Sequence, residues 1–245
     1  INRGVEIHYD GDLPARSGMG SSSCFTVGLM KAISELYKKN LSCTQLAKKA
    51  IHFEQKIMNE VVGSQDQIAA SIGGFNKIIF KNNNKFSIKK ILKKNNIKKL
   101  EKNLILIYTG INRTAHKIAS TYVTKLTKSK KKYIMNIYEQ VLEGEKLLNT
   151  GKIDEFGKLL HYAWIEKKKL SKSISNNKID ELYNYAIKNG ALGGKLLGAG
   201  GGGFLLLYMK NEHRRKFFNN NKRLINVPFN FSREGSQVIF KNLKR

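Results

Sequence analysis

Residues 18–23 of the stretch PARSGMGSSSCFTVGLM place two glycines and three serines directly before a long apolar run. Glycine allows positive φ angles and keeps Cβ atoms away from any ligand that approaches the backbone. At the start of a helix the first N–H groups are unpaired and the helix dipole is positive, which favours anions. The stretch therefore predicts either an ordinary turn with Ser21 or Ser22 as the helix N-cap, or a loop that binds an anion.

The spacing of apolar residues predicts a chain of the α+β class, with segregated helices and strands. We expect helices at about 22–37, after the capping box of Ser42 and Gln45, within 63–74, and at 114–127, 131–149, 152–170, 178–189 and 211–220. We expect strands at 4–10, 104–108, 204–209, 223–227 and 236–240, and a hairpin of 75–80 and 85–88. The Lys-rich stretch 89–103 is the best candidate for a boundary, which divides the chain into domains 1–100 and 104–245.

A second glycine cluster, GAGGGG at 198–203, lies between a predicted helix and a predicted strand. Five glycines in six positions cost conformational entropy, and a tight turn needs only one or two, so a functional loop is favoured. The cluster also spells GxGxxG, but the dinucleotide-binding fingerprint follows a strand and opens a helix. Dinucleotide binding is therefore excluded.

Glu54 and Asp66 form a candidate acidic pair. Glu54 lies beside the apolar stripe of the second helix, and Asp66 begins the short helix after Gly63. One carboxylate could hold a metal ion while the other orients or deprotonates a hydroxyl group. Acidic residues at a helix start are also common as caps, so both interpretations stay open.

The chain has a net charge of +27, and a strongly positive charge is common among nucleic-acid-binding proteins. Here the basic residues are spread along the chain among Asn and Ile, with no aromatic residues interleaved in a basic motif. We therefore expect solvated surfaces and no nucleic-acid partner. A positive field would still help the protein to bind phosphorylated ligands.

Other features of the chain bear on its location. No run of about 18 uncharged apolar residues is present, so we expect no membrane partner. Cys24 and Cys43 form no disulfide framework or metal motif, which is typical of a cytoplasmic protein. The start, INRGVEIHYD, already alternates as a strand does, so we expect this sequence to be a fragment.

Three motifs in order, LPARSGMGSSS, FEQKIMNEVVGSQDQIAASIGGFN and GGKLLGAGGGGFLLLY, resemble the GHMP kinase superfamily of galactokinase, homoserine, mevalonate and phosphomevalonate kinases. The second motif is most similar to the bacterial sugar-kinase branch that includes D-glycero-D-manno-heptose 7-phosphate kinase. The resemblance covers about residues 5–240. It implies an N-terminal domain like domain 2 of ribosomal protein S5, a ferredoxin-like C-terminal domain, and an active site between them.

The resemblance also implies roles for individual residues. Mg²⁺ would be bound by Ser22 (or Ser21) and Glu54, and Asp66 would lie beside the acceptor hydroxyl as the catalytic residue. Ser23 and Cys24 stand where many members carry two alanines. The residues implied for ATP binding are Pro14, Gly18, Met19, Gly20, Ser21, Ser22 and Ser23, and those expected on the substrate side are Gln65, Arg113, Gly200, Gly201 and Gly202.

The function implied is ATP-dependent phosphorylation of a hydroxyl on a sugar or sugar phosphate, with ATP and Mg²⁺ as cofactors. Alternatives are another acceptor, such as galactose or a mevalonate-like alcohol, a non-catalytic nucleotide- or sugar-binding relative, and a basic nucleic-acid-binding module. The N-terminal family motif, roughly R-x-P-L-R-[IV]-S-x-x-G-G-x-T-D, is absent from this sequence, as in a partial or defective protein. The sequence leaves the acceptor, the phosphorylated hydroxyl and the oligomeric state open.

Overall fold

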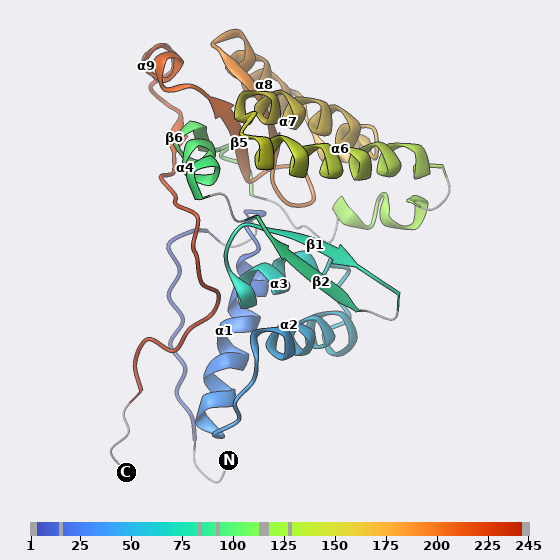
Figure 1. Cartoon of the computed structure of the whole chain (residues 1–245), viewed down its shortest axis with the longest axis vertical. Helices are drawn as coiled ribbons and strands as arrows, with labels where there is room; N and C mark the ends of the chain where they lie inside the picture. The colour runs from blue at the N-terminus through green and yellow to red at the C-terminus, as the bar shows by residue number, and fades with distance from the viewer. Residues whose placement is uncertain are drawn as a thin grey trace.

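The structure is a computed structural model, which describes residues 4–14, 17–82, 85–91, 94–112, 118–126 and 129–241. Its elements form two parts that lie one above the other in Figure 1. The lower part holds α1–α3 and the β1–β2 hairpin, and the upper part holds the larger sheet with the later helices. No helix within the described ranges combines the length and the apolar character that crossing a membrane requires.

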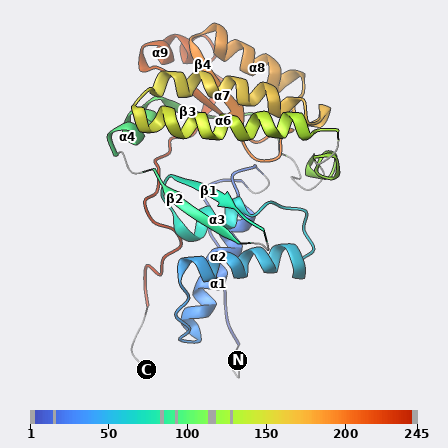
Figure 2. The same ribbon diagram turned by 45° about the vertical axis from the view of Figure 1, so that its right-hand side comes forward.

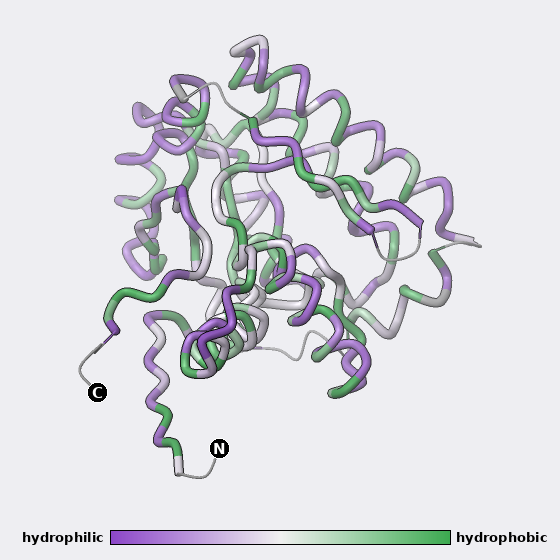
Figure 3. Tube along the Cα trace, turned by 60° about the horizontal axis from the view of Figure 1, so that its bottom comes forward, coloured by the Kyte–Doolittle hydropathy of each residue, from purple (hydrophilic) through white to green (hydrophobic). Residues whose placement is uncertain are grey.

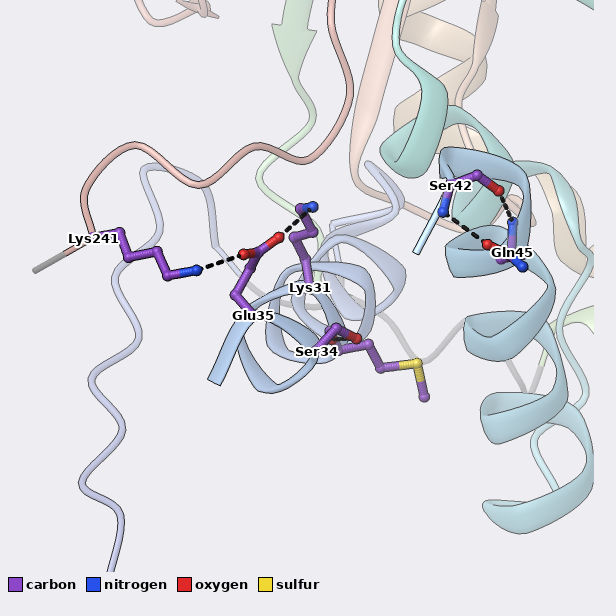
Figure 4. A network of polar contacts seen from close by, with 7 residues as sticks. Lys31, Ser34, Glu35, Ser42, Gln45 and Lys241 are labelled. Atoms are coloured by element: carbon purple, nitrogen blue, oxygen red, sulfur yellow. Dashed lines mark hydrogen bonds and ion pairs between the residues drawn. The ribbon is translucent and has the colours of Figure 1, made fainter. Parts of the chain in front are cut away.

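The first part of the chain is mainly helical. The side chain of Ser42 accepts a hydrogen bond from the Gln45 amide, and the Gln45 side chain accepts one from the Ser42 amide, which confirms the predicted capping box (Figure 4). The predicted hairpin is also confirmed, with Asn76 opposite Lys90. The elements are α1 (Ser21–Leu36), α2 (Cys43–His52), the π-helical turn η1 (Phe53–Ile57), α3 (Gln65–Ile72), β1 (Asn76–Phe80) and β2 (Phe86–Lys90).

The second part is built on a four-stranded sheet with the order β4-β5-β3-β6, in which all neighbouring strands are antiparallel. In the described residues, three long helices lie between β3 and β4 and one helix lies between β5 and β6, which gives the βαββαβ connectivity of a ferredoxin-like domain. The strands are β3 (Leu104–Tyr108), β4 (Ala191–Leu196), β5 (Phe204–Met209) and β6 (Ile225–Asn226). The helices are α4 (Lys94–Asn103), η2 (Val123–Lys125), α6 (Lys131–Thr150), α7 (Ile153–Lys168), η3 (Lys172–Ile174), α8 (Asn177–Lys188) and α9 (Asn211–Asn219).

Alternate residues of the sheet enter two apolar clusters. Ile107 and Leu205 belong to the cluster that contains Trp164 and α8, whereas Leu104 and Tyr208 pack with the ends of α6 and α7. Strand side chains alternate between the two faces, so one sheet supports both clusters. In Figure 3 the helices change between hydrophilic and hydrophobic along the trace, as helices with one buried face do.

The segment after β6 runs back along the first part of the molecule (Figure 1). The Gly74 amide donates to the Ser232 carbonyl at 2.9 Å, and the Ser236 amide donates to the Ala70 carbonyl at 2.8 Å. Lys241 reaches Glu35 of α1, with 3.1 Å between Nζ and Oε2 (Figure 4). The end of the described chain therefore packs on α3 and α1, while the division into 1–100 and 104–245 stays a prediction.

Two predicted strands are wrong. Residues 4–10 are extended but unpaired, and the side chain of Ile7 is 57% exposed, because no described strand lies beside them to complete a ladder. Residues 236–240 are also outside any strand, since the Ser236 amide bonds to α3 instead.

Other predictions concern the second part of the chain. Most of the Lys-rich stretch 89–103 forms α4, whose Leu100 is buried, and its role as a boundary stays a prediction. Strand β4 was not predicted, because its glycines mask the strand pattern. Of the predicted helix 114–127, residues 114–117 and 127 lie outside the described residues, and the part between them contains the short helix η2. The other predicted helices and the strands at 104–108 and 204–209 are confirmed within about two residues.

Candidate active site

The loop before α1 ends on Gly20, which is the helix N-cap with a φ of 72°. The alternative in which Ser21 or Ser22 is the N-cap is therefore wrong, because these serines are already the first two residues of the helix. Because Gly20 has no side chain, it makes no capping hydrogen bond to the first turn, and the turn holds no acidic residue. Its N–H groups therefore remain available to an anion, and the helix dipole favours one there.

Asp66 lies directly against this helix start. A Cβ atom on Gly20 would come within 3.2 Å of both Cγ and Oδ2 of Asp66, so the glycine makes room for the carboxylate and also adopts the positive φ. Burial raises the pKa of Asp66, a hydrogen bond from Gln65 partly offsets the rise, and the charge of Glu54 adds to it. The beginnings of α1 and α3 therefore meet at one point.

Glu54 is 2% exposed and lies on η1, at the end of α2. Its Oε2 accepts hydrogen bonds from Ser23 Oγ at 3.0 Å and from Gln67 Nε2 at 2.5 Å. Its Oε1 is buried and has no hydrogen-bond partner among the described residues. Irregular π-helical turns are frequent at functional sites, and here the turn presents a carboxylate with one oxygen held and the other free.

The free oxygen of Glu54 fits a cation. No group of three or more His, Cys, Asp or Glu side chains within the described ranges could hold a metal ion by itself. Mg²⁺, however, is commonly bound by one or two carboxylates together with water and substrate phosphates. Glu54 is therefore the residue that would hold Mg²⁺, with Asp66 close by. Ser22 is exposed, and the serine that contacts Glu54 is Ser23.

The second glycine cluster reaches the same region from the other part of the chain. Gly203 has a φ of 93°, and a Cβ atom there would lie 1.8 Å from the carbonyl oxygen of Ser17, at the base of the first loop. The Gly203 carbonyl accepts hydrogen bonds from the Thr109 amide at 2.9 Å and the Thr109 hydroxyl at 2.7 Å. The loop is thereby fixed between the end of β3 and the loop that precedes α1.

The remaining predicted residues are placed as follows. Gly200 and Gly202 pack on Ile174 and Ile111, where protein atoms fill the space of the missing side chains. Gln65 is exposed beside Asp66, Pro14 is exposed, and Arg113 lies outside the described residues. Their substrate and nucleotide roles stay predictions.

Sequence reasoning missed three residues of this site: Ser17, Gln67 and Thr109. Ser17 and Gln67 are fully buried polar residues in motifs that were otherwise recognised. Gln67 follows Asp66 directly in the sequence SQDQ, which is the one signal that could have drawn attention to it. Its contact with Glu54 spans 13 residues and becomes visible only when α3 is packed on η1.

Comparisons with known proteins agree with this arrangement. A family model described as the GHMP kinases N terminal domain matches residues 1–74, and one described as GHMP kinases C terminal matches residues 145–221. The first match contains the loop, Glu54 and Asp66, and the second contains the glycine loop at 198–203.

Individual relatives extend the likeness. The chain is 34% identical over 196 residues to D-glycero-alpha-D-manno-heptose 7-phosphate kinase of Campylobacter jejuni. The aligned region covers 79% of this chain and 58% of that protein. It is 26% identical to galactokinase of Pyrococcus furiosus over 227 residues, covering 80% of this chain and 62% of the relative. A crystal structure of a D-glycero-D-manno-heptose 1-phosphate kinase from Bacteroides thetaiotaomicron superposes with a TM-score of 0.70 at 26% identity, over 91% of this chain and 64% of that one.

The chain thus spans about three fifths of the length of these relatives. Within that span, the Gly-Ser loop before α1, the acidic pair of Glu54 and Asp66, and the glycine loop at 198–203 occur in this order and meet in space. The matches to both halves of one family, on a single chain that folds as that family does, show that it belongs to the GHMP kinases.

Proposed function

We propose that this protein is an ATP-dependent kinase that phosphorylates a hydroxyl group of a sugar or sugar phosphate, of the heptose 7-phosphate kinase type. The observation that carries the proposal is the contact of Asp66 with Gly20, which puts a carboxylate at the uncapped start of α1. A site for phosphate and a group for a hydroxyl proton are thereby adjacent, as transfer between two oxygens requires.

The loop and the first turn of α1 would bind the phosphates of ATP. Their N–H groups are not used by a side-chain cap, and the positive end of the helix dipole faces the same place. Donors fixed in this way stabilise the charge on the transferred phosphoryl group without reorganising during the reaction. Gly18, Gly20, Ser21 and Ser22 are the residues we assign to this role.

Glu54 would hold Mg²⁺ through its free Oε1, while Ser23 and Gln67 keep Oε2 in place. When bound there, the ion would neutralise charge on the β- and γ-phosphates. Ser22 or Ser21 would complete the ion's protein ligands.

Asp66 would orient the acceptor hydroxyl and accept its proton. The new bond forms between the acceptor oxygen and the γ-phosphorus, the bond from that phosphorus to the ADP oxygen breaks, and the proton passes to Asp66. Burial and the nearby Glu54 raise the pKa of Asp66, which makes it a better base than an exposed carboxylate. An ionised Asp66 is needed at the start of the step.

The acceptor is proposed from the printed activities of the relatives, among which the 34% identical protein is a heptose 7-phosphate kinase. Galactokinase and mevalonate kinase relatives share less sequence, at 26% and 28% identity, and supply the alternative acceptors. A non-catalytic relative is less well supported, because Glu54 and Asp66 are both present and both lie near the loop. A cytoplasmic location also stays a prediction.

The test is ADP release by the full-length protein with ATP, Mg²⁺ and a set of acceptors. We expect turnover with D-glycero-D-manno-heptose 7-phosphate and little with galactose or mevalonate. If only galactose or mevalonate gives turnover, the proposed acceptor is wrong but the proposed kinase activity stands. No ADP release with any acceptor, together with normal ATP binding, would favour the non-catalytic reading.

A further inference from the structure

A pocket of about 220 Å³ lies between the two parts of the chain, away from the site described above. Its walls come from α6, from α7, from β4 and from the residues around the β1–β2 hairpin, and Figure 2 shows the hairpin close to α6. Asp66 is the second residue of α3, whereas Asn76, in the pocket wall, follows the far end of that helix. An eight-residue helix is about 12 Å long, so the pocket and the Asp66 site are separate.

Most of the pocket wall is apolar. One face of α6 and one face of α7 supply residues at helical spacing, and Phe75 and Ile91 close the pocket from the hairpin side. Val141 is 49% exposed, so the pocket opens to solvent along α6. The apolar lining residues on the two helices are Ile137, Val141, Leu148, Phe156, Leu159, Leu160 and Ala163.

Lys195 of β4 lines this pocket, and no hydrogen bond or ion pair joins its ammonium group to any other described residue. Burial lowers the pKa of Lys195, and no neighbouring charge opposes that effect. Lys195 is partly buried, and an ammonium group that has lost part of its water without gaining a partner is costly. Such a group is rare unless something else neutralises it.

Among the described residues, the wall holds one carboxylate, and it is already neutralised. Glu145 forms ion pairs with Lys77 at 2.5 Å and with Lys89 at 2.6 Å, one on each oxygen. Lys195 is therefore a third ammonium group for one carboxylate, and the pocket lacks negative charge.

Two amide oxygens in the wall also lack a donor. Asn76 Oδ1 and Gln140 Oε1 are buried, and neither oxygen has a hydrogen-bond partner among the described residues. Both residues line the pocket together with Lys195. Two unpaired acceptors and one cation without an ion-pair partner on a single apolar surface fit a molecule that brings donors and a negative charge.

We propose that this pocket binds a small organic anion that carries a hydroxyl group. The anionic group would pair with Lys195, hydroxyl donors would reach Asn76 and Gln140, and the carbon skeleton would lie on the apolar wall. A hydroxy acid and a phosphorylated polyol both have this chemistry. Because the site lies apart from Asp66, the proposal does not depend on kinase activity.

Calorimetric titration of the full-length protein without nucleotide tests the proposal. The probes are 3-phenyllactate for the hydroxy acids and glycerol 3-phosphate for the phosphorylated polyols, with 3-phenylpropanol, glycerol and inorganic phosphate as comparators. We expect one of the two probes to bind at least tenfold more tightly than its comparators. Absence of binding by both probes, or equal binding by glycerol or inorganic phosphate, would overturn the proposal.

Variants connect the binding to the pocket. Lys195→Met and Gln140→Leu should each weaken binding of that probe at least tenfold, whereas Lys132→Met, on an exposed part of the same helix α6, should leave it unchanged. Undiminished affinity in Lys195→Met would contradict the assignment.

The thermal stability of the free protein gives a second measurement that does not need a ligand. Because the ammonium group of Lys195 is unpaired, Lys195→Met should raise Tm by about 2 °C or more in the absence of probe. A lysine with a purely structural role would give the opposite sign. A lower Tm of the folded variant would therefore count against an unpaired charge in the pocket, even if a probe binds.

Discussion

Gln67 donates a hydrogen bond from Nε2 to Oε2 of Glu54 across 2.5 Å, and both side chains are buried. Ser23 donates to the same oxygen at 3.0 Å, so one oxygen of the carboxylate is held twice and the other is left free. The glutamate is thereby oriented before any ion arrives, which reduces the cost of ordering it during binding.

Replacing Gln67 by Met should release Glu54 and weaken binding of Mg·ATP. A hydrogen bond to a charged group contributes about 1.5–3 kcal/mol, so the affinity should fall by roughly tenfold to a hundredfold. Calorimetry with and without Mg²⁺ is the measurement, and the affinity for ATP alone should change little. An equal loss in both conditions would mean that Gln67 supports the fold and does not position Glu54.

Replacing Asp66 by Asn should reduce turnover by a factor on the order of 10² to 10⁴, because the proton acceptor is lost while the shape is kept. Nucleotide binding should persist within about threefold. Steady-state ADP release and nucleotide calorimetry on the same preparation are the measurements. Near-normal turnover in the variant would remove Asp66 from the proposed chemistry.

The same variant should show a pH dependence of stability with a definite sign. Since the folded pKa of Asp66 is raised, mainly by burial, its ionised form disfavours the folded state. This cost is absent below the unfolded pKa and appears as the pH rises through the folded pKa. Asp66→Asn should therefore be more stable than the parent protein at pH 7, and the difference should shrink in acid; urea titrations at both pH values would show it.

Ser22→Ala tests the predicted magnesium ligand. If the hydroxyl of Ser22 binds the ion, Mg·ATP affinity should fall by about tenfold, which corresponds to about 1.4 kcal/mol. Ser23→Ala is the matched comparison, because it removes a contact to Glu54 from the next residue along the helix. An unchanged affinity in Ser22→Ala would transfer the role to Ser21.

Gly203→Ala should destabilise the protein by at least about 3 kcal/mol. The new Cβ atom would lie 1.8 Å from the Ser17 oxygen, and the positive φ of 93° would strain the alanine as well. Gly28→Ala is the control, since its Cβ atom meets nothing within 4 Å inside α1 and should stabilise the helix by about 0.5–1 kcal/mol. Urea unfolding measures both, and a neutral Gly203→Ala would show that the two loops are not in contact.

Local signals carried the sequence predictions that succeeded. The capping box of Ser42 and Gln45 lies within four residues, and the start of α1 follows directly from the glycines and serines before it. Helical periodicity placed α6, α7 and α8 because each buries one face over several turns.

Predictions that depended on partners distant in the sequence failed. The alternation at residues 4–10 is that of a strand, but strand formation needs a neighbour, and the described chain offers none there. Strand β4 is the reverse case, because it was not predicted and yet is a strand. Its sequence ALGGKL has weak strand preference, but pairing with β5 makes it a strand.

The sequence by itself determined the family resemblance, the two glycine loops and the acidic pair of Glu54 and Asp66, because each is a short pattern with a direct chemical meaning. Only the tertiary structure decided that Gly20 touches Asp66, that Gly203 presses on Ser17, and that Gln67 holds Glu54. These contacts join residues 13 to 186 positions apart, so they arise from how α1, η1, α3 and the sheet pack and leave no local trace in the chain. The unpaired charge of Lys195 is of the same kind, since whether a lysine finds a partner depends on which surfaces meet around it.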